Sequence, residues 1–206
     1  MLQLSAPAIV CAARGHGETG VIVRLMTEAY GLVGGFVAGG RGRNLRPIVI
    51  PGNRVEVELS ARSDSQLPSA RLELVASCGP WLGEPLASAG IGWATTLTAR
   101  SLPERHAYPA LWSALSALLD AICMAPSARG WAAALAGYEA LLLREMGFGG
   151  VPSLPDSEDF SVVMAMLERL GPQIARHSLA DRRSGVKGSD VMGARTVLME
   201  RLSKIG

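Results

Sequence analysis

Apolar and polar side chains alternate with a period of two in the first part of the chain. Residues 54–60 and 71–74 both follow this alternation, which is typical of a strand with one packed face and one face in water. Turn-forming residues between them, Ser63-Asp64-Ser65 and Pro68-Ser69, predict a hairpin over residues 54–76. Together with three apolar runs upstream, this gives five short strands with glycine-rich turns, the pattern of a small β-barrel. The upstream runs are residues 8–13, 21–26 and 32–38, separated by Gly15-His16-Gly17 and Tyr30-Gly31.

After Pro80 the apolar residues recur with the period of an α-helix. Four such stripes predict helices, and the glycine-rich residues 147–150 end the second one. Pro80 to Pro85 is the predicted junction, because two prolines, a glycine and the change of period coincide there. The fold class is therefore predicted as α+β, with a barrel over residues 1–79 and an all-α domain over residues 80–206. The stripes are Leu111, Leu115, Leu118, Leu119 and Ile122; Leu135, Tyr138 and Leu142; Phe160, Val163, Met164, Leu167 and Leu170; and Val191, Ala194, Leu198, Leu202 and Ile205.

The composition narrows the class of protein. The 206 residues are 49% hydrophobic, enough for one or two compact domains. The longest charge-free run, residues 85–99, is shorter than the roughly 18 residues that a membrane span needs. The apolar residues 4–13 lack the charged start of a secretory signal, so we expect a cytoplasmic protein. Three scattered cysteines, Cys11, Cys78 and Cys123, predict reduced thiols, with no zinc, disulfide framework or other cofactor.

Charge is distributed unevenly along the chain. The net charge is +2, but residues 1–80, 81–167 and 168–206 carry +2, −4 and +4. No acidic residue lies between Glu28 and Glu56, whereas four arginines do. A nucleic-acid role would therefore depend on local charge rather than on the whole chain.

Three motifs suggest a nucleotide, metal or catalytic site, but the residues around them do not support such a site. Gly15, Gly17 and Gly20 spell G-x-G-x-x-G, but β-branched residues follow where a dinucleotide site needs a helix. His16 and Glu18 lack a nucleophile or a third metal ligand nearby in the sequence. Ser184 and Lys187 form an S-x-x-K string without its companion motifs. No catalytic or metal-binding residue is predicted.

Arginines in the acid-free segment are the candidate binding residues. Arg41, Arg43 and Arg46 stand among Gly40 and Gly42, and their guanidinium groups suit phosphate oxygens. The alternative is a solvated loop, and the cluster alone favours neither. A small barrel favours binding, because such barrels bind single strands on a sheet face and adjoining loops. The predicted DNA-binding residues are Arg14, Arg24, Arg41, Arg43, Arg46 and Arg54. Secondary candidates are Arg176, Arg182 and Arg183, which belong to a basic carboxy-terminal stretch that also includes Arg195. The favoured interpretation of this stretch is that its charges solvate amphipathic helices.

Several short motifs resemble the bacterial RecO recombination and repair proteins. In the first half these are Ala8-Ile9-Val10, residues 14–18, residues 25–32, Gly39-Gly40-Arg41 and Pro51-Gly52. In the second half they are residues 102–105, Tyr138-Glu139 with residues 141–143, and residues 145–149. Their order and spacing cover about residues 6–150, and in this resemblance Arg41, Arg43 and Arg46 align with the basic residues that follow the family's glycine pair.

The resemblance implies an oligonucleotide-binding (OB) barrel followed by a helical domain. It also implies a non-enzymatic mediator that binds single- and double-stranded DNA, anneals complementary strands, and works with RecR and single-stranded DNA-binding protein to load RecA. Two departures stand out: no cysteine follows Gly150, where many relatives carry a zinc cluster, and Ala136 and Gly137 replace an arginine that some relatives have. The docking site for single-stranded DNA-binding protein is therefore left open. The alternative function is a protein-docking module whose barrel binds an acidic peptide, with only incidental DNA contact.

Overall fold

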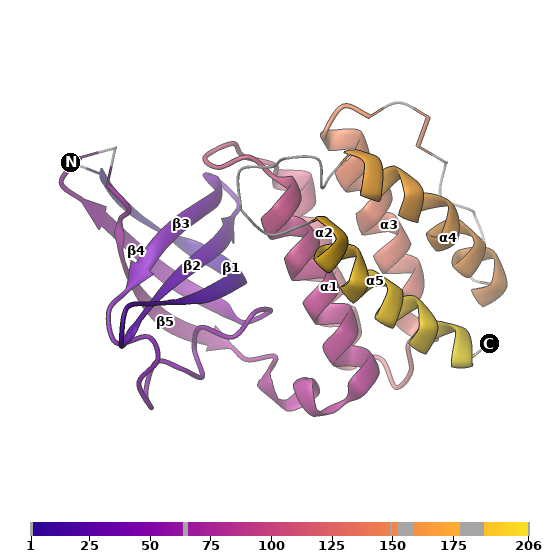
Figure 1. The fold of residues 1–206 in the computed structure, drawn as a ribbon, viewed down its shortest axis with the longest axis horizontal. Coiled ribbons are helices and arrows are strands. Elements are labelled where there is room, and N and C mark those ends of the chain that lie inside the picture. Colours follow the sequence, from indigo (N-terminus) through magenta and orange to yellow (C-terminus); the bar gives the residue numbers. More distant parts are fainter. Residues whose placement is uncertain (1, 64–65, 149, 152–158, 178–187, 206) are drawn as a thin grey trace. The chain divides into compact units, whose positions relative to one another are not determined.

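The chain folds into a strand-rich unit followed by helices (Figure 1). The computed structural model describes residues 2–63, 66–148, 150–151, 159–177 and 188–205. Its contacts divide it into two compact units, one of Met1–Gly83 with Leu102–Trp112, and one of Glu84–Ser101 with Ser113–Gly206. The predicted fold class, a barrel followed by an all-α region, is confirmed. The predicted division at residues 79 and 80 stays a prediction, while the contacts group residues 102–112 with the strands.

Five strands close into a barrel in the order β1-β2-β3-β5-β4. All neighbouring pairs are antiparallel except β3 and β5, which meet in parallel at Phe36 and Ser69. A five-stranded Greek-key barrel that closes this way is the OB-fold. The strands are β1 (Leu2–His16), β2 (Gly20–Thr27), β3 (Gly31–Val37), β4 (Arg54–Ala61) and β5 (Ser69–Ala76).

The first strand is longer than the sequence predicted. Gly15 and His16 were expected in a turn, but β1 continues through His16 and the turn begins at Gly17. The register of β1 against β2 shifts between Val10 and Ala12, which makes Cys11 the extra residue of a β-bulge. After the bulge, the residues of β1 that would otherwise face the core face outward, and the residues between them face the core.

Alternating apolar residues of the strands fill the barrel. Val10, Val23, Leu25 and Val57 are representative of this core, which also includes Val49 from the loop between β3 and β4. Asn53 is fully buried and holds that loop, because its side-chain amide donates to the carbonyl oxygens of Pro47 and Ile48 at 2.8 and 3.1 Å. The loop over residues 38–53 is therefore an ordered part of the barrel.

Residues 102–112 pack against the start of β3. The backbone N–H of Arg105 donates to the carbonyl oxygen of Leu32 at 2.8 Å, and Glu104 forms a β-bridge with Leu32. Gly31 has a φ of 66°, and a Cβ there would lie 1.8 Å from the carbonyl oxygen of His106. Only glycine allows this close approach.

The helices include the four that the sequence predicted and one that it missed. The missed helix, α1, has no single apolar stripe, because residues on most of its sides are buried, among them Trp93, Ala94 and Leu97. No helix in the described part of the chain is long and apolar enough to cross a membrane. The helices are α1 (Pro85–Ser101), α2 (Pro109–Met124), α3 (Arg129–Glu145), α4 (Phe160–His177) and α5 (Gly188–Leu202), with 3₁₀ turns over Gly79–Gly83 and Ser203–Ile205.

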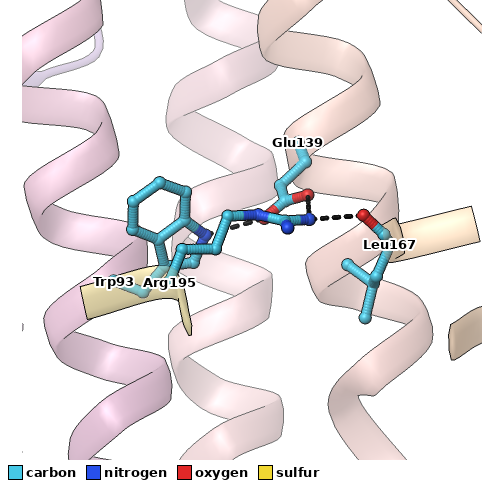
Figure 2. A network of polar contacts seen from close by, with 4 residues as sticks. All are labelled: Trp93, Glu139, Leu167 and Arg195. Atoms are coloured by element: carbon cyan, nitrogen blue, oxygen red, sulfur yellow. Dashed lines mark hydrogen bonds and ion pairs between the residues drawn. The ribbon is translucent and has the colours of Figure 1, made fainter. Parts of the chain in front are cut away.

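A buried polar network joins four elements of the helical unit (Figure 2). Glu139 of α3 accepts hydrogen bonds from the indole Nε1 of Trp93 at 2.7 Å and from Nε of Arg195 at 3.0 Å. Nη2 of Arg195 also pairs with Glu139 Oε2 at 2.8 Å and donates to the carbonyl oxygen of Leu167 at 2.5 Å. Arg195, counted above with the basic carboxy-terminal stretch, is thus a buried structural residue and not a surface cation.

Candidate nucleic-acid interface

The bulge in β1 turns Arg14 and His16 toward the outer face of the barrel. After the shift, Arg14 lies opposite Ile22 instead of the core residue Val21. Ile22 in turn pairs with Phe36 of β3, so Arg14, Ile22 and Phe36 form one outward-facing row. Arg14 is exposed in this row and can reach a ligand on the surface of β1, β2 and β3.

Arg24 lies on the same outer face, in the row next to that of Arg14, Ile22 and Phe36. Its neighbours are Ala12 on β1 and Gly34 on β3. The guanidinium forms an ion pair with Glu104 at 3.2 Å, and 29% of the Arg24 side chain is exposed. Part of its charge is therefore neutralised within the barrel unit.

Phe36 and His16 form an aromatic pair at the end of this face. Their ring centroids are 5.9 Å apart in an edge-to-face arrangement. The Phe36 ring lies over the backbone of Gly20, where a Cβ would come within 2.4 Å of it. The sequence suggested His16 only as a catalytic or metal-binding residue, and offered Phe36 and Tyr30 as the only aromatic residues before Trp81 that could stack on a base. The pairing of His16 with Phe36 could not be predicted, because it forms only when β1, β2 and β3 come together.

All three arginines of the predicted cluster are exposed, and Arg41 also makes contacts within the barrel unit. The backbone N–H of Arg41 donates to the carbonyl oxygen of Thr19 at 2.9 Å. Its Nη1 lies 3.4 Å from the carbonyl oxygens of both Gly17 and Glu18. Arg41 thus ties the loop between β3 and β4 to the β1–β2 turn, while Arg43 and Arg46 are exposed on that loop.

The structure places two of the remaining predicted DNA-binding residues, Arg54 and Arg176. Arg54 begins β4, opposite Ile9 of β1, and is half-buried. Arg176 is exposed on α4. Arg182 and Arg183 lie outside the described residues. Among the residues with a described position, no three His, Cys, Asp or Glu side chains gather as a metal site requires.

The outer face of β4 and β5 carries more acidic than basic side chains, with Glu56, Glu58 and Glu73 beside Arg54 and Arg71. Glu56 stands directly across from Glu73, and Glu58 stands across from Arg71. The ion pair between Arg71 and Glu58 is long, at 3.9 Å, and both side chains are largely exposed. Exposed arginines are instead found on the face of β1, β2 and β3 and on the 38–53 loop, namely Arg14, Arg43 and Arg46. We call these the acidic face and the cationic face.

The strand order defines the first unit as an OB-fold domain. Residues 1–78 match the family model described as Recombination protein O N terminal, and residues 82–151 match Recombination protein O C terminal. The chain belongs to the RecO family of DNA repair proteins. The family resemblance seen in the sequence is therefore confirmed.

Three relatives illustrate the match. A DNA repair protein RecO from Caulobacter vibrioides is 43% identical over 150 residues, covering 72% of this chain and 58% of that protein. The protein of the same name from Phenylobacterium zucineum is 41% identical over 150 residues, covering 72% and 60%. That from Rhodospirillum centenum is 41% identical over 149 residues, covering 72% and 58%. The chain spans about three-fifths of the length of these relatives.

Proposed function

We propose that the protein mediates DNA repair by recombination. It binds single- and double-stranded DNA on the cationic face, anneals complementary strands, and acts with RecR and single-stranded DNA-binding protein to load RecA. The observation that carries this proposal is the uneven charge of the barrel. Arg14, Arg43 and Arg46 are exposed on β1 and the 38–53 loop, whereas Glu56 and Glu73 face each other on β4 and β5. Family membership supports the repair role.

The mechanism needs no covalent step. Arginines that contact phosphates release condensed counterions, and this release drives DNA binding without regard to sequence. When the same cations lie between two strands, they lower the repulsion between the strands, and base pairing supplies the free energy of annealing. The protein then acts as a mediator and not as an enzyme, in the cytoplasm where the chromosome lies.

A salt titration tests the interface. We expect Arg43→Ala with Arg46→Ala to reduce the slope of log affinity against log salt by about 1.4 on a single-stranded oligonucleotide, because each contact contributes about 0.7. Arg41 is kept, since its loss would also release the β1–β2 turn. The matched control is Arg71→Ala, an exposed arginine on the acidic face, which should leave the slope unchanged.

The loss should not depend on base sequence, because phosphate contacts carry no sequence information. Circular dichroism establishes that the variants are folded. An unchanged slope in a folded Arg43→Ala, Arg46→Ala variant would mean that these arginines only solvate the loop. Equal losses in the variant and in the Arg71→Ala control would show that the charge of the whole barrel matters and not one face.

The partners are tested in an annealing assay. Complementary strands coated with single-stranded DNA-binding protein should anneal in the presence of the protein, and RecA should load faster on a coated strand when RecR is added with it. The double variant should lose both activities. Full activity in a variant that no longer binds DNA would favour a protein-docking function.

A further inference from the structure

A cavity of about 500 Å³ opens in the barrel unit. It lies where the β2–β3 turn, the loop before β5 and the residues after α1 meet. Its lining includes Tyr30, Gly34, Leu67, Pro68, Glu104 and Arg105. We call it the Tyr30 pocket. Its volume is that of a small-molecule site.

The rim of the Tyr30 pocket exposes large apolar side chains. Tyr30 is 45% exposed and Leu67 is 48% exposed. The core residues Leu4, Val33 and Leu59 also line the cavity, so its floor is apolar and rigid. An apolar cavity with an exposed aromatic ring at its mouth suits a flat, partly apolar ligand.

Arg105 lines the same cavity as Tyr30 and supplies a cation in a constrained backbone conformation. Its φ is 59°, and it is the one non-glycine residue with positive φ in the part of the chain that the structure describes. The hydrogen bond to Leu32 and the close approach of Gly31 to His106 hold it there. Its acidic neighbour Glu104 is paired with Arg24. Such conformations cost free energy and are found disproportionately at ligand sites.

The pocket continues the cationic face. Gly34 lines the pocket and also stands beside Arg24 in the outward row of β2 and β3. Phe36 is two residues further along β3, or about 7 Å away. A strand bound along β3 over Phe36 therefore reaches the pocket next.

We propose that the Tyr30 pocket holds one unstacked base of single-stranded DNA, with the base against the Tyr30 ring and its phosphate on Arg105. This inference rests on the proposed function and adds to it a preference for single strands. A base in a duplex is stacked between its neighbours and cannot enter, whereas single strands offer free bases to aromatic side chains. The cationic face alone binds both forms of DNA.

Affinity for matched single-stranded and duplex oligonucleotides tests the proposal. Tyr30→Leu should weaken single-strand binding about tenfold, the loss typical of one base stack, and leave duplex binding unchanged. Tyr30→Phe keeps the ring and should bind as the unchanged protein does. Arg105→Gly should also weaken single-strand binding while its melting temperature is not lowered, because glycine accepts this φ. A 2-aminopurine base in the strand should lose fluorescence on binding, and less so with Tyr30→Leu.

The outcomes separate this proposal from the proposed function. Equal losses on single strands and duplexes in Tyr30→Leu would overturn the base pocket. Unchanged single-strand affinity in Tyr30→Leu, with a reduced salt slope in the Arg43→Ala, Arg46→Ala variant, would overturn the pocket and leave the DNA function standing. An acidic peptide with a free carboxylate end that binds the protein, and loses binding with Arg105→Gly while DNA affinity stays the same, would assign the pocket to protein docking instead.

Discussion

The ion pair of Glu139 and Arg195 is the most constrained contact in the helical unit. The two side chains are 1% and 7% exposed, so both charges have left water. That cost is offset by further hydrogen bonds to both charges, from the indole of Trp93 to Glu139 and from Arg195 to the carbonyl oxygen of Leu167. Sequence periodicity could not identify this pair, since Arg195 is one of several basic residues near the carboxy terminus.

We predict that replacing only one residue of the pair lowers stability strongly, whereas replacing both residues lowers it much less. Arg195→Met leaves the Glu139 charge buried without a cation, and should lower the free energy of unfolding by about 3–5 kcal/mol. Changing Glu139→Leu in addition should restore much of that loss, because no charge remains. The measurement is urea unfolding of both variants. Arg176→Met, at an exposed arginine of α4, is the control and should stay within about 0.5 kcal/mol of the unchanged protein.

Cys11 carries a second prediction at this scale. Burial raises the pKa of the Cys11 thiol to about 12 from 9.0. Between these values the unfolded chain loses the proton and the folded chain keeps it, so Cys11 reduces stability as the pH rises above about 9. At pH 8 a thiol reagent should label the half-buried Cys123 first and Cys11 only on unfolding. Rapid labelling of Cys11 in folded protein, located by mass spectrometry, would contradict its burial.

At the scale of elements, periodicity predicted strands and helices wherever one face is buried. The hairpin of β4 and β5 and the helices α2 to α5 were found for that reason. Two features were missed because they break the simple period. The bulge at Cys11 shifts the alternation of β1 by one residue, and α1 is buried on most sides and shows no stripe. Arg14 was therefore predicted as a DNA ligand without any knowledge of its face.

Removing α5 tests how far the helical unit depends on its last helix. Val191, Leu198 and Leu202 are buried along α5, and each buried aliphatic side chain contributes about 1.5–3 kcal/mol. Ending the chain before residue 188 also removes Arg195 and leaves Glu139 without its cation. We expect the helical unit to lose cooperative unfolding in calorimetry. An unchanged melting profile would mean that α5 is dispensable for folding and serves a partner instead.

At the scale of the molecule, closure of the barrel creates the interface from distant segments. The acid-free segment between Glu28 and Glu56 predicted where exposed cations would be. Arg43 and Arg46 in this segment are indeed exposed. The sequence could not show that Arg41 holds a turn or that His16 meets Phe36, because both depend on contacts between β1, β3 and the following loop. The net charge of +2 also gives no sign that Glu56 and Glu73 stand opposite each other on β4 and β5.

The acidic face provides the final prediction. Glu56 and Glu73 repel each other across β4 and β5, so changing both to Gln should stabilise the barrel modestly, by about 0.2–1 kcal/mol. If DNA stays on the cationic face, the same variant should keep the salt slope of the unchanged protein, because the slope counts the phosphates that cations neutralise and this change adds no cation. Thermal unfolding and the salt titration of the one variant measure both effects. A steeper slope after this change would mean that DNA also covers β4 and β5, and the cationic face would then be only part of a path that encircles the barrel.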